Sequence, residues 1–331
     1  MNPVLPQRDT AAEPERGERA LVRRIAARLA ASAAPPGSGS SAATESAGVP
    51  FGDDMAAIEG TDSALLWTTD TLMDGIDFDS RQHAWRDIGR KAIAVSLSDC
   101  AAMAVRPVSA LCNLVLCENM TADDALELVG GAVDFAARWG CAIVGGDTNS
   151  WRQPTVISFT VAARACADLA PVRRDGAQPG DRIFITGRVG GSILGRHMTF
   201  EPRVEQALAI ARRVRVHAQI DVSDGVAIDL SRVCEASRCG AVLDERDVRL
   251  AIHADAERLA AQDGVAALEH ALYDGEDFEL LCVLPADVPD RALNELGLLA
   301  IGRIVAEPGL WMRHADGARR VVEARGWEHF R

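Results

Sequence analysis

Acidic side chains recur along this sequence in short motifs, each beside a glycine, a hydroxyl residue or an apolar run. The motifs are Gly52-Asp53-Asp54, Thr68-Thr69-Asp70, Ser98-Asp99, Gly145-Gly146-Asp147-Thr148, Asp221-Val222-Ser223-Asp224-Gly225 and Gly275-Glu276-Asp277. Clustered carboxylates repel one another unless a cation lies between them, and oxygen-rich clusters of this kind bind hard divalent cations such as Mg²⁺. Because bound Mg²⁺ recruits phosphates, the motifs predict a metal-dependent enzyme that acts on phosphates, provided that the fold brings them together.

The first strand-like motif combines hydroxyl groups with a carboxylate. The apolar run from Ala64 to Thr69 predicts a strand that ends at the carboxylate of Asp70. Side chains alternate along a strand, so Thr68 and Asp70 share one face. Such a group of oxygens suits a hard metal, whereas an aspartate that caps a turn is the plainer interpretation of this motif on its own.

Two later motifs place acidic residues where phosphates are commonly bound. Gly145 and Gly146 follow a predicted strand over 141–144, and glycines at a strand end let a phosphate approach the backbone closely. Asp224 lies at the predicted N-terminus of a helix, where free N–H groups and the helix dipole favour an anion or a metal-bridged phosphate. The structural alternatives are a turn that ends the strand and a helix N-cap formed by Ser223 or Asp224.

Composition excludes several other classes of protein. The net charge of −13 argues against a nucleic-acid-binding surface. Lys91 is the single lysine and follows no glycine-rich loop, and the Walker-like run over 190–196 lacks the lysine and Ser/Thr of a P-loop. The eight cysteines and seven histidines show no zinc spacing, and the cysteines are expected to be free in a reducing cytoplasm. No membrane-spanning stretch or signal peptide is expected.

The hydrophobic pattern predicts a disordered tail followed by two domains of the α/β or α+β class, in keeping with the 331-residue length. The tail, over 1–48, contains an amphipathic helix at 18–29 and an Ala/Ser/Gly/Pro linker at 33–48. For the first domain, 49–168, the predicted strands are 64–69, 110–116, 141–144 and 155–163, and the helices are 85–104 and 122–139. For the second domain, 169–331, the predicted connection is 171–181, the strands are 182–186, 278–284 and 298–305, and the helices are 203–216 and 226–236.

Taken together and in this order, the motifs resemble those of the thiamine-monophosphate kinase family. That family belongs to a superfamily with aminoimidazole ribonucleotide synthetase, selenophosphate synthetase and the hydrogenase maturation protein HypE. The resemblance runs from about Glu18 to Phe330 and closes with Gly-Trp-Glu-His-Phe at 326–330. The other matching segments are Gly-Asp-Asp at 52–54, Thr-Thr-Asp-Thr-Leu at 68–72, Lys-Ala-Ile-Ala-Val-Ser-Leu-Ser-Asp at 91–99, Ala-Ala-Met at 101–103, Gly-Gly-Asp-Thr at 145–148, Gly-Asp-Arg-Ile-Phe-Ile-Thr-Gly at 180–187, Asp-Val-Ser-Asp-Gly at 221–225 and Gly-Glu-Asp-Phe-Glu-Leu at 275–280.

The resemblance implies a two-domain fold of the aminoimidazole ribonucleotide synthetase-like type. Its N-terminal domain would have a mixed sheet with helices, dimerise through that sheet and bind ATP and several Mg²⁺ ions. Its C-terminal α/β domain would complete the substrate cleft. The implied activity is phosphoryl transfer from ATP to thiamine monophosphate, which yields thiamine diphosphate in thiamine biosynthesis. The implied protein is a cytoplasmic homodimer with no nucleic-acid or membrane partner.

Residue roles follow from the resemblance position by position. The metal ligands it implies are Asp54, Thr68, Thr69, Asp70, Asp99, Asp147, Asp221 and Asp224. The nucleotide contacts are Gly146, Asp147, Arg174 and Ser223, and the substrate contacts are Asp77, Glu276 and Trp327. The candidate catalytic residues among these are Asp70, Asp147, Arg174 and Asp221. An aromatic ring at Trp327 would stack on the cationic thiamine ring.

Three positions depart from the family pattern. Asp77 stands where the family usually has a histidine near the substrate, and Asp274 stands where it usually has a glycine. Cys117-Glu118-Asn119 replaces a proline-containing strand end. All three bear on the acceptor more than on ATP or Mg²⁺. Two alternatives therefore remain: a related ATP-dependent enzyme with another phosphorylated small molecule as substrate, and a catalytically silent nucleotide-binding dimer, which the intact set of carboxylates disfavours.

Overall fold

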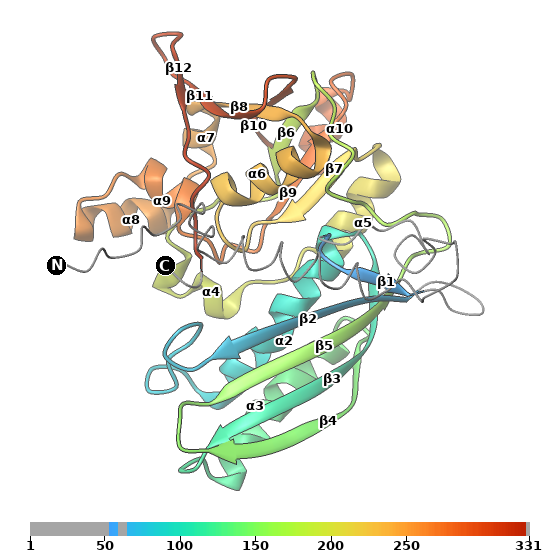
Figure 1. The fold of residues 1–331 in the computed structure, drawn as a ribbon, viewed down its shortest axis with the longest axis vertical. Coiled ribbons are helices and arrows are strands. Elements are labelled where there is room, and N and C mark those ends of the chain that lie inside the picture. Colours follow the sequence, from blue (N-terminus) through green and yellow to red (C-terminus); the bar gives the residue numbers. More distant parts are fainter. Residues whose placement is uncertain (1–52, 59–64, 329–331) are drawn as a thin grey trace, which may run out of the picture. The chain divides into compact units, whose positions relative to one another are not determined.

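The structure, a computed structural model, describes residues 53–58 and 65–328. Apart from Glu328, these residues belong to one compact unit that spans Glu45–Trp327. The described part has two β-sheets with helices packed against them (Figure 1), which confirms the predicted α/β fold class. The tail, helix and linker predicted within 1–48 lie outside the described residues.

The first sheet is mixed and, in the described residues, has the strand order β1-β2-β5-β3-β4 (Figure 1). Its strands are β1 Ala56–Ile58, β2 Leu65–Met73, β3 Arg106–Cys117, β4 Ala142–Trp151 and β5 Val156–Arg164. Neighbouring strands are antiparallel except β3 and β4, which are parallel. A parallel pair needs a crossover connection, and helix α3 (Ala122–Ala137) supplies it. Helices α2 (Trp85–Ala102) and α3 cover one face of this sheet (Figure 1).

Strands β2, β3 and β4 of the first sheet are longer than the apolar runs predicted, and the extensions of β2 and β4 change where site candidates lie. Strand β2 continues to Met73, so Asp70 lies inside the strand and not at its end. Strand β4 continues to Trp151, so the predicted strand-end turn at Gly145 and Gly146 is wrong. Polar residues are compatible with these extensions because β4 is an edge strand of the described sheet and most of its side chains are exposed.

Helix α2 is the central element of the site. A Cβ atom on Gly89 would lie 1.8 Å from the carbonyl oxygen of Leu128, and one on Gly131 would lie 1.9 Å from that of Arg86. Glycine at these positions therefore lets α2 and α3 pack closely. The buried face of α2 is mostly apolar but also carries Lys91, Ser96 and Ser98. Buried polar groups need partners, and their partners come from several distant segments.

The second sheet has the strand order β12-β11-β8-β10-β6-β9-β7 in the described residues. Its strands are β6 Arg182–Ile185, β7 Ala218–Asp221, β8 Gly240–Asp244, β9 Leu280–Leu284, β10 Leu299–Val305, β11 Gly309–Arg313 and β12 Arg319–Val321. The helices of this region are η1 Ser192–Leu194, α4 Arg196–Thr199, α5 Val204–Arg213, α6 Val226–Ser237, α7 Glu245–Leu250, α8 Ala254–Asp263, α9 Ala267–Tyr273 and α10 Asp290–Glu295. The predicted strands at β6, β9 and β10 and the predicted helices at α5 and α6 are confirmed, whereas β7, β8 and α7–α10 were not predicted.

The two sheets share apolar packing around α2. Leu280, Cys282 and Leu284 of β9 belong to the same buried cluster as Ile88 and Leu97 of α2. This common core fixes α2 between the first sheet and the second. We propose that the boundary between the two domains lies between residues 168 and 169. No helix within the described ranges is long and apolar enough to cross a membrane.

Candidate active site

Three carboxylates from distant segments converge beside the end of α2. They belong to Asp54 before β1, Asp99 in the last turn of α2 and Asp221 at the end of β7, and one oxygen of each lies within 4.8 Å of the others. Burial, and then the charges of Asp70 and Asp221, raise the pKa of Asp99 well above its usual value. Burial and the charge of Asp54 likewise raise the pKa of Asp221. Repulsion of this kind favours a bound cation, and an all-oxygen donor set suits a hard divalent one.

Hydroxyl groups orient these carboxylates and their neighbour Asp70. The hydroxyl of Thr68 donates to Asp99. Ser96 Oγ donates to Asp70 Oδ2 at 2.7 Å, and Ser98 Oγ donates to Asp221 Oδ2 at 2.6 Å. Thr68 and Asp70 both meet α2, so their predicted common face is confirmed. Burial raises the pKa of Asp70 to about 6, with a smaller contribution from the charge of Asp54.

A buried amide holds the two elements that carry Asp99 and Asp221. Gln219 lies two residues before Asp221 on β7 and is fully buried. Its Nε2 donates to the carbonyl oxygens of Ala101 and Ala102, each at 2.9 Å. These carbonyls belong to the last residues of α2, just beyond Asp99. Gln219 and Ser96 were not singled out in the sequence, where a polar residue within a buried strand or helix face was the only signal for them, whereas Ser98 was part of the Ser98-Asp99 motif.

Arg174 lies at the edge of the carboxylate cluster. Its Nη2 is 2.6 Å from Asp54 Oδ1 and its Nε is 3.0 Å from Asp54 Oδ2. The guanidinium thus forms a bidentate ion pair with this carboxylate. The backbone N–H of Arg174 also donates to Asp53 Oδ2 at 3.2 Å. Burial, and then the neighbouring Asp54 charge, raise the pKa of Asp53 to about 6. The predicted nucleotide contact therefore touches a predicted metal ligand directly.

Three other predicted residues are not brought to this cluster within one chain. Thr69 Oγ1 lies 3.0 Å from Thr160 Oγ1 on β5, on the face of the sheet opposite α2. Asp147 is exposed on β4, three strand positions from β2, which corresponds to about 14 Å. A Cβ atom on Gly146 would lie 1.7 Å from the carbonyl oxygen of Cys112. Glycine is thus required at 146 for packing of β4 on β3, whatever its role toward a nucleotide.

Asp224, in the loop between β7 and α6, is not among the carboxylates that converge in the described structure. Asp224 Oδ2 lies 2.6 Å from Arg232 Nη2. The N-cap of α6 is Gly225, without a side-chain cap, so the N-cap interpretation of Ser223 and Asp224 is wrong. Asp229 instead accepts hydrogen bonds from the N–H groups of Asp224 and Gly225, each at 3.1 Å. The carbonyl oxygen of Ser223 accepts from Glu276 N at 2.6 Å, which ties this loop to the substrate candidates.

Two of the three substrate candidates meet at Lys91. Lys91 Nζ lies 2.6 Å from Glu276 Oε1 and also donates to the carbonyl oxygen of Asp77. The carboxylate of Asp77 accepts a hydrogen bond from Met73 N at 2.7 Å. The aspartate that departs from the family pattern therefore stabilises the turn in which it lies, after β2. The third candidate, Trp327, is 49% exposed, and its backbone N–H donates to the carbonyl oxygen of Asp224 at 2.9 Å.

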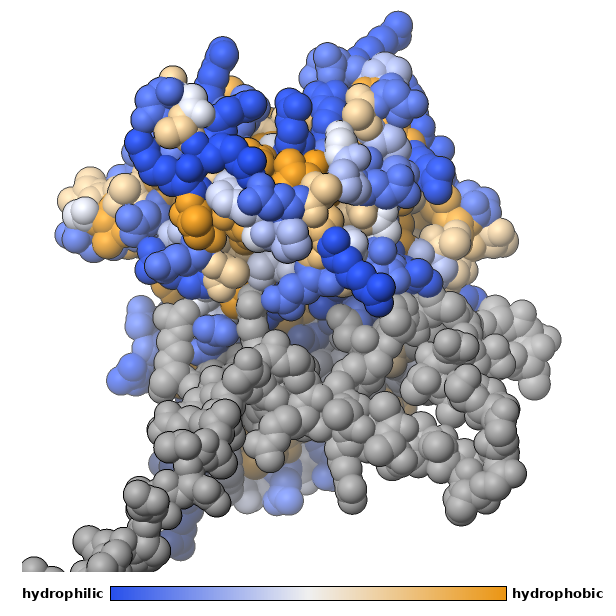
Figure 2. All heavy atoms as spheres, turned by 45° about the horizontal axis from the view of Figure 1, so that its top comes forward, coloured by the Kyte–Doolittle hydropathy of each residue, from blue (hydrophilic) through white to orange (hydrophobic). Residues whose placement is uncertain are grey.

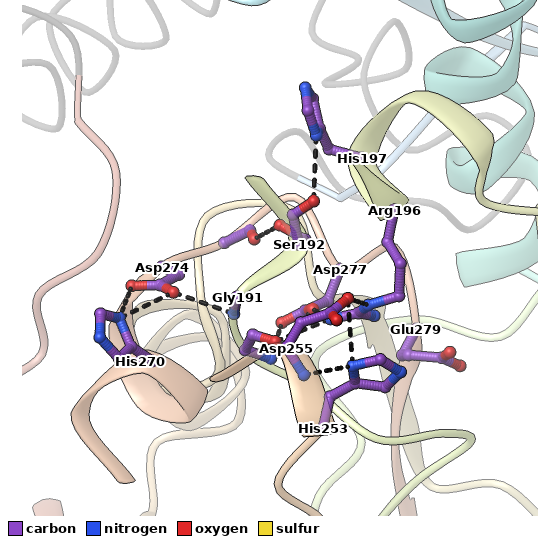
Figure 3. Close-up of polar contacts among 12 residues, drawn as sticks. Gly191, Ser192, Arg196, His197, His253, Asp255, His270, Asp274, Asp277 and Glu279 are labelled. Atoms are coloured by element: carbon purple, nitrogen blue, oxygen red, sulfur yellow. Dashed lines mark hydrogen bonds and ion pairs between the residues drawn. The ribbon is translucent and has the colours of Figure 1, made fainter. Parts of the chain in front are cut away.

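A second polar network joins the Walker-like run over 190–196 to Asp274, one of the departures from the family pattern (Figure 3). Asp277 Oδ2 accepts from Gly190 N at 2.9 Å, and Asp274 Oδ2 accepts from Gly191 N at 3.0 Å. Arg196 Nη2 donates to Asp277 Oδ1 at 2.9 Å. The first two N–H groups of the run, those of Gly190 and Gly191, are therefore bonded to carboxylates and not open to a phosphate. Asp274 has a structural role in holding this turn.

The chain is similar to known proteins over nearly its full length. Residues 52–165 match the model of the AIR synthase related protein, N-terminal domain, and residues 178–313 match that of the C-terminal domain. The thiamine-monophosphate kinase of Rhodopirellula baltica is 40% identical over 292 residues, which cover 85% of this chain and 91% of that protein. The thiamine-monophosphate kinase of Methanospirillum hungatei is 35% identical over 239 residues, covering 69% of this chain and 78% of that protein.

Solved structures give the same relationship. The structure of AaThiL complexed with AMPPCP and TMP superposes with a TM-score of 0.78 and 26% sequence identity. The alignment covers 95% of this chain and 97% of that chain. The hydrogenase maturation protein HypE in complex with ATP superposes with a TM-score of 0.68 at 21% identity and shares the fold.

Proposed function

The chain belongs to the thiamine-monophosphate kinase family of AIR synthase related proteins, and we propose that it phosphorylates thiamine monophosphate to thiamine diphosphate with ATP. AaThiL, which was solved with AMPPCP and TMP, supports this choice of donor and acceptor. The observation that carries the proposal is the group of three carboxylates within 4.8 Å of one another. Such a group has no evident structural benefit, because burial and the neighbouring charges raise the pKa of Asp99 and of Asp221.

Asp54, Asp99 and Asp221 would hold Mg²⁺, together with Asp70 and the hydroxyl of Thr68. When bound, Mg²⁺ neutralises charge on the transferred phosphoryl group and on the two polyanions that must meet. The acceptor is an ionised phosphate, so the reaction needs no strong general base. In keeping with this, the side chains that contact the three carboxylates in the described structure are hydroxyls and a guanidinium.

Arg174 supplies the fixed positive charge of the proposed site. Its two hydrogen bonds to Asp54 pair the guanidinium with that carboxylate. A cation that takes Asp54 as a ligand would weaken that pair and leave the guanidinium fork for a phosphate of ATP. Ser223 and Asp224 lie in the loop after Asp221 and are the remaining nucleotide and metal candidates of this segment.

We propose that Thr69 and Asp147, the predicted metal ligands outside the cluster, bind metal only in a homodimer. Thr69 and Asp147 face away from α2 but lie about 14 Å apart in one chain, so a metal shared by them would require Asp147 of the partner subunit. Large hydrophobic side chains are exposed on β3 and β4, namely Val108, Leu111, Val144 and Trp151. On the forward face over the second sheet, Figure 2 shows hydrophobic side chains as separate patches among hydrophilic ones. The first sheet is therefore the better surface for a second copy.

We place the enzyme in the cytoplasm, where its eight cysteines would stay reduced. The direct test of function is ADP formation from ATP and Mg²⁺ with and without thiamine monophosphate, with the product identified by mass. We expect acceptor-dependent ADP and thiamine diphosphate, at about 0.1–10 s⁻¹. ADP with a different phosphorylated acceptor only would identify the related-enzyme alternative, and no turnover with any acceptor would identify the silent dimer.

Asp99→Asn tests the metal cluster within the same assay. The substitution keeps the size of the side chain and removes one charge from the cluster, so we expect at least a 100-fold loss of turnover at millimolar Mg²⁺. Asp168→Asn is the matched control, because Asp168 is an exposed carboxylate paired with Arg212. Equal rates for the two variants would contradict the metal assignment.

A further inference from the structure

Lys91 is the only lysine in the sequence, and its side chain is fully buried. An ammonium group out of contact with water costs several kcal/mol unless it is paired and hydrogen-bonded. Lys91 satisfies this condition with two partners, the carboxylate of Glu276 at 2.6 Å and the carbonyl oxygen of Asp77. These are two of the three substrate candidates, and they come from segments far apart in the sequence.

The Glu276 end of this contact has an unusual backbone. Glu276 has φ 51° and follows Gly275 with φ 76°. The left-handed region costs a residue with a side chain about 1 kcal/mol or more, and it persists only where surrounding contacts fix it. Here the contacts are the bond from Glu276 N to the Ser223 carbonyl and the ion pair with Lys91. Lys91 thus determines where the carboxylate of Glu276 lies.

The Asp77 end is a tight turn after β2. Asp77 Oδ2 accepts from Met73 N at 2.7 Å, and Gly75 N donates to the carbonyl oxygen of Phe78 at 2.7 Å. The turn carries a buried anchor at Phe78 and exposes Ile76. Phe78 packs in the same buried cluster as Ile88 of α2, and the hydrogen bond from Lys91 Nζ to the Asp77 carbonyl is a polar connection between the turn and α2. The position of the turn relative to Glu276 therefore also depends on Lys91.

The geometry excludes the usual role of a kinase lysine. A lysine that binds a phosphate of ATP must present its ammonium to the nucleotide, whereas the ammonium of Lys91 is enclosed and already bonded to two oxygens. We infer that Lys91 is a positioning residue for the acceptor, which holds Glu276 and the Asp77 turn in the arrangement that binds thiamine monophosphate. This inference rests on the proposed function and concerns the acceptor, not ATP.

The test compares Lys91→Met, Glu276→Gln and the double variant with wild type. Each single variant is expected to raise the KM for thiamine monophosphate at least tenfold and to leave the KM for ATP within twofold. If Lys91 acts through Glu276, the double variant is expected to be no worse than the worse single variant. The double variant also removes the unpaired carboxylate that would destabilise Lys91→Met, so it reports on acceptor binding even if the single variant fails to fold.

Arg203→Met is the matched control. It breaks another ion pair with a buried carboxylate, that of Glu279, so it has a similar effect on stability but touches none of the substrate candidates. An acceptor KM within twofold of wild type in Lys91→Met, or in the double variant where Lys91→Met does not fold, would overturn the inference. Equal increases in the KM for ATP and for the acceptor, or the same acceptor effect in Arg203→Met, would also overturn it.

Calorimetric titration with thiamine monophosphate separates this inference from the proposed function. Wild-type protein that binds the acceptor without acceptor-dependent ADP release would refute the proposed function, and the Kd values of the variants would then decide the role of Lys91. Wild-type protein that does not bind the acceptor would refute both. Wild-type turnover with unchanged acceptor affinity in the Lys91 variants would refute only the inference.

Discussion

Asp70→Asn is expected to stabilise the metal-free protein while abolishing its activity. The pKa of Asp70 rises from 3.8 to about 6 on folding, mainly through burial. A carboxylate with a raised pKa contributes stability that is present below about pH 4 and is lost as the pH rises through 6. The rise corresponds to about 3 kcal/mol. Because Asp70 is only half-buried, solvent screening reduces this cost to about 1–2 kcal/mol at pH 8.

Asparagine at this position keeps an oxygen that accepts the hydrogen bond from Ser96 and carries no charge. The metal-free variant is therefore expected to exceed wild type by about 1–2 kcal/mol in free energy of unfolding at pH 8, and to differ less at pH 4. Mg²⁺ is expected to stabilise wild type more than the variant, because the variant has lost a ligand. Acceptor-dependent turnover should fall at least 100-fold in the variant.

Chemical denaturation at pH 4 and pH 8, with EDTA or with Mg²⁺, measures the unfolding free energies, and the ADP assay measures turnover. The difference between variant and wild type isolates Asp70 from the other groups that titrate in this range. A variant that is less stable than wild type at pH 8 without metal would refute the reasoning on burial. A variant that gains as much stability from Mg²⁺ as wild type would refute the metal assignment of Asp70.

Two further predictions concern residues that support the site. Burial and the charge of Lys91 lower the pKa of His197 to about 4, so neutral His197 contributes stability above about pH 6.5 that is lost as the pH falls toward 4. His197→Asn should reduce the loss of unfolding free energy between pH 7 and pH 5, and an unchanged loss would contradict this. Gln219→Leu removes the side-chain donor from two buried carbonyls of α2; that of Ala101 still accepts from Ala104 N, whereas that of Ala102 loses its donor. The substitution should cost about 1–3 kcal/mol and weaken Mg²⁺ binding, and a cost below about 0.5 kcal/mol on urea denaturation would contradict this.

Local sequence patterns predicted the elements that carry the site. Apolar residues with helical spacing predicted α2, and its observed range Trp85–Ala102 differs from the predicted 85–104 only at its end. Strand alternation placed Thr68 and Asp70 on one face, and their bonds to Asp99 and Ser96 confirm it. Strand β7 was missed because its four residues include the polar Gln219 and Asp221, whose partners on α2 are remote in sequence.

The sequence by itself determined the fold class, the family resemblance and the supply of carboxylates, because these depend on periodicity and on ordered short motifs. Only the tertiary structure decided which carboxylates meet. Packing of α2 between two sheets brings Asp54, Asp99 and Asp221 together, whereas Asp147 lies on an edge strand. It also gave Asp274 a structural role and made Lys91 the link between Asp77 and Glu276. The physical reason is that the spacing of residues along the chain fixes which face of a helix or strand each side chain occupies. The partners of that side chain depend on how elements remote in the sequence pack against one another.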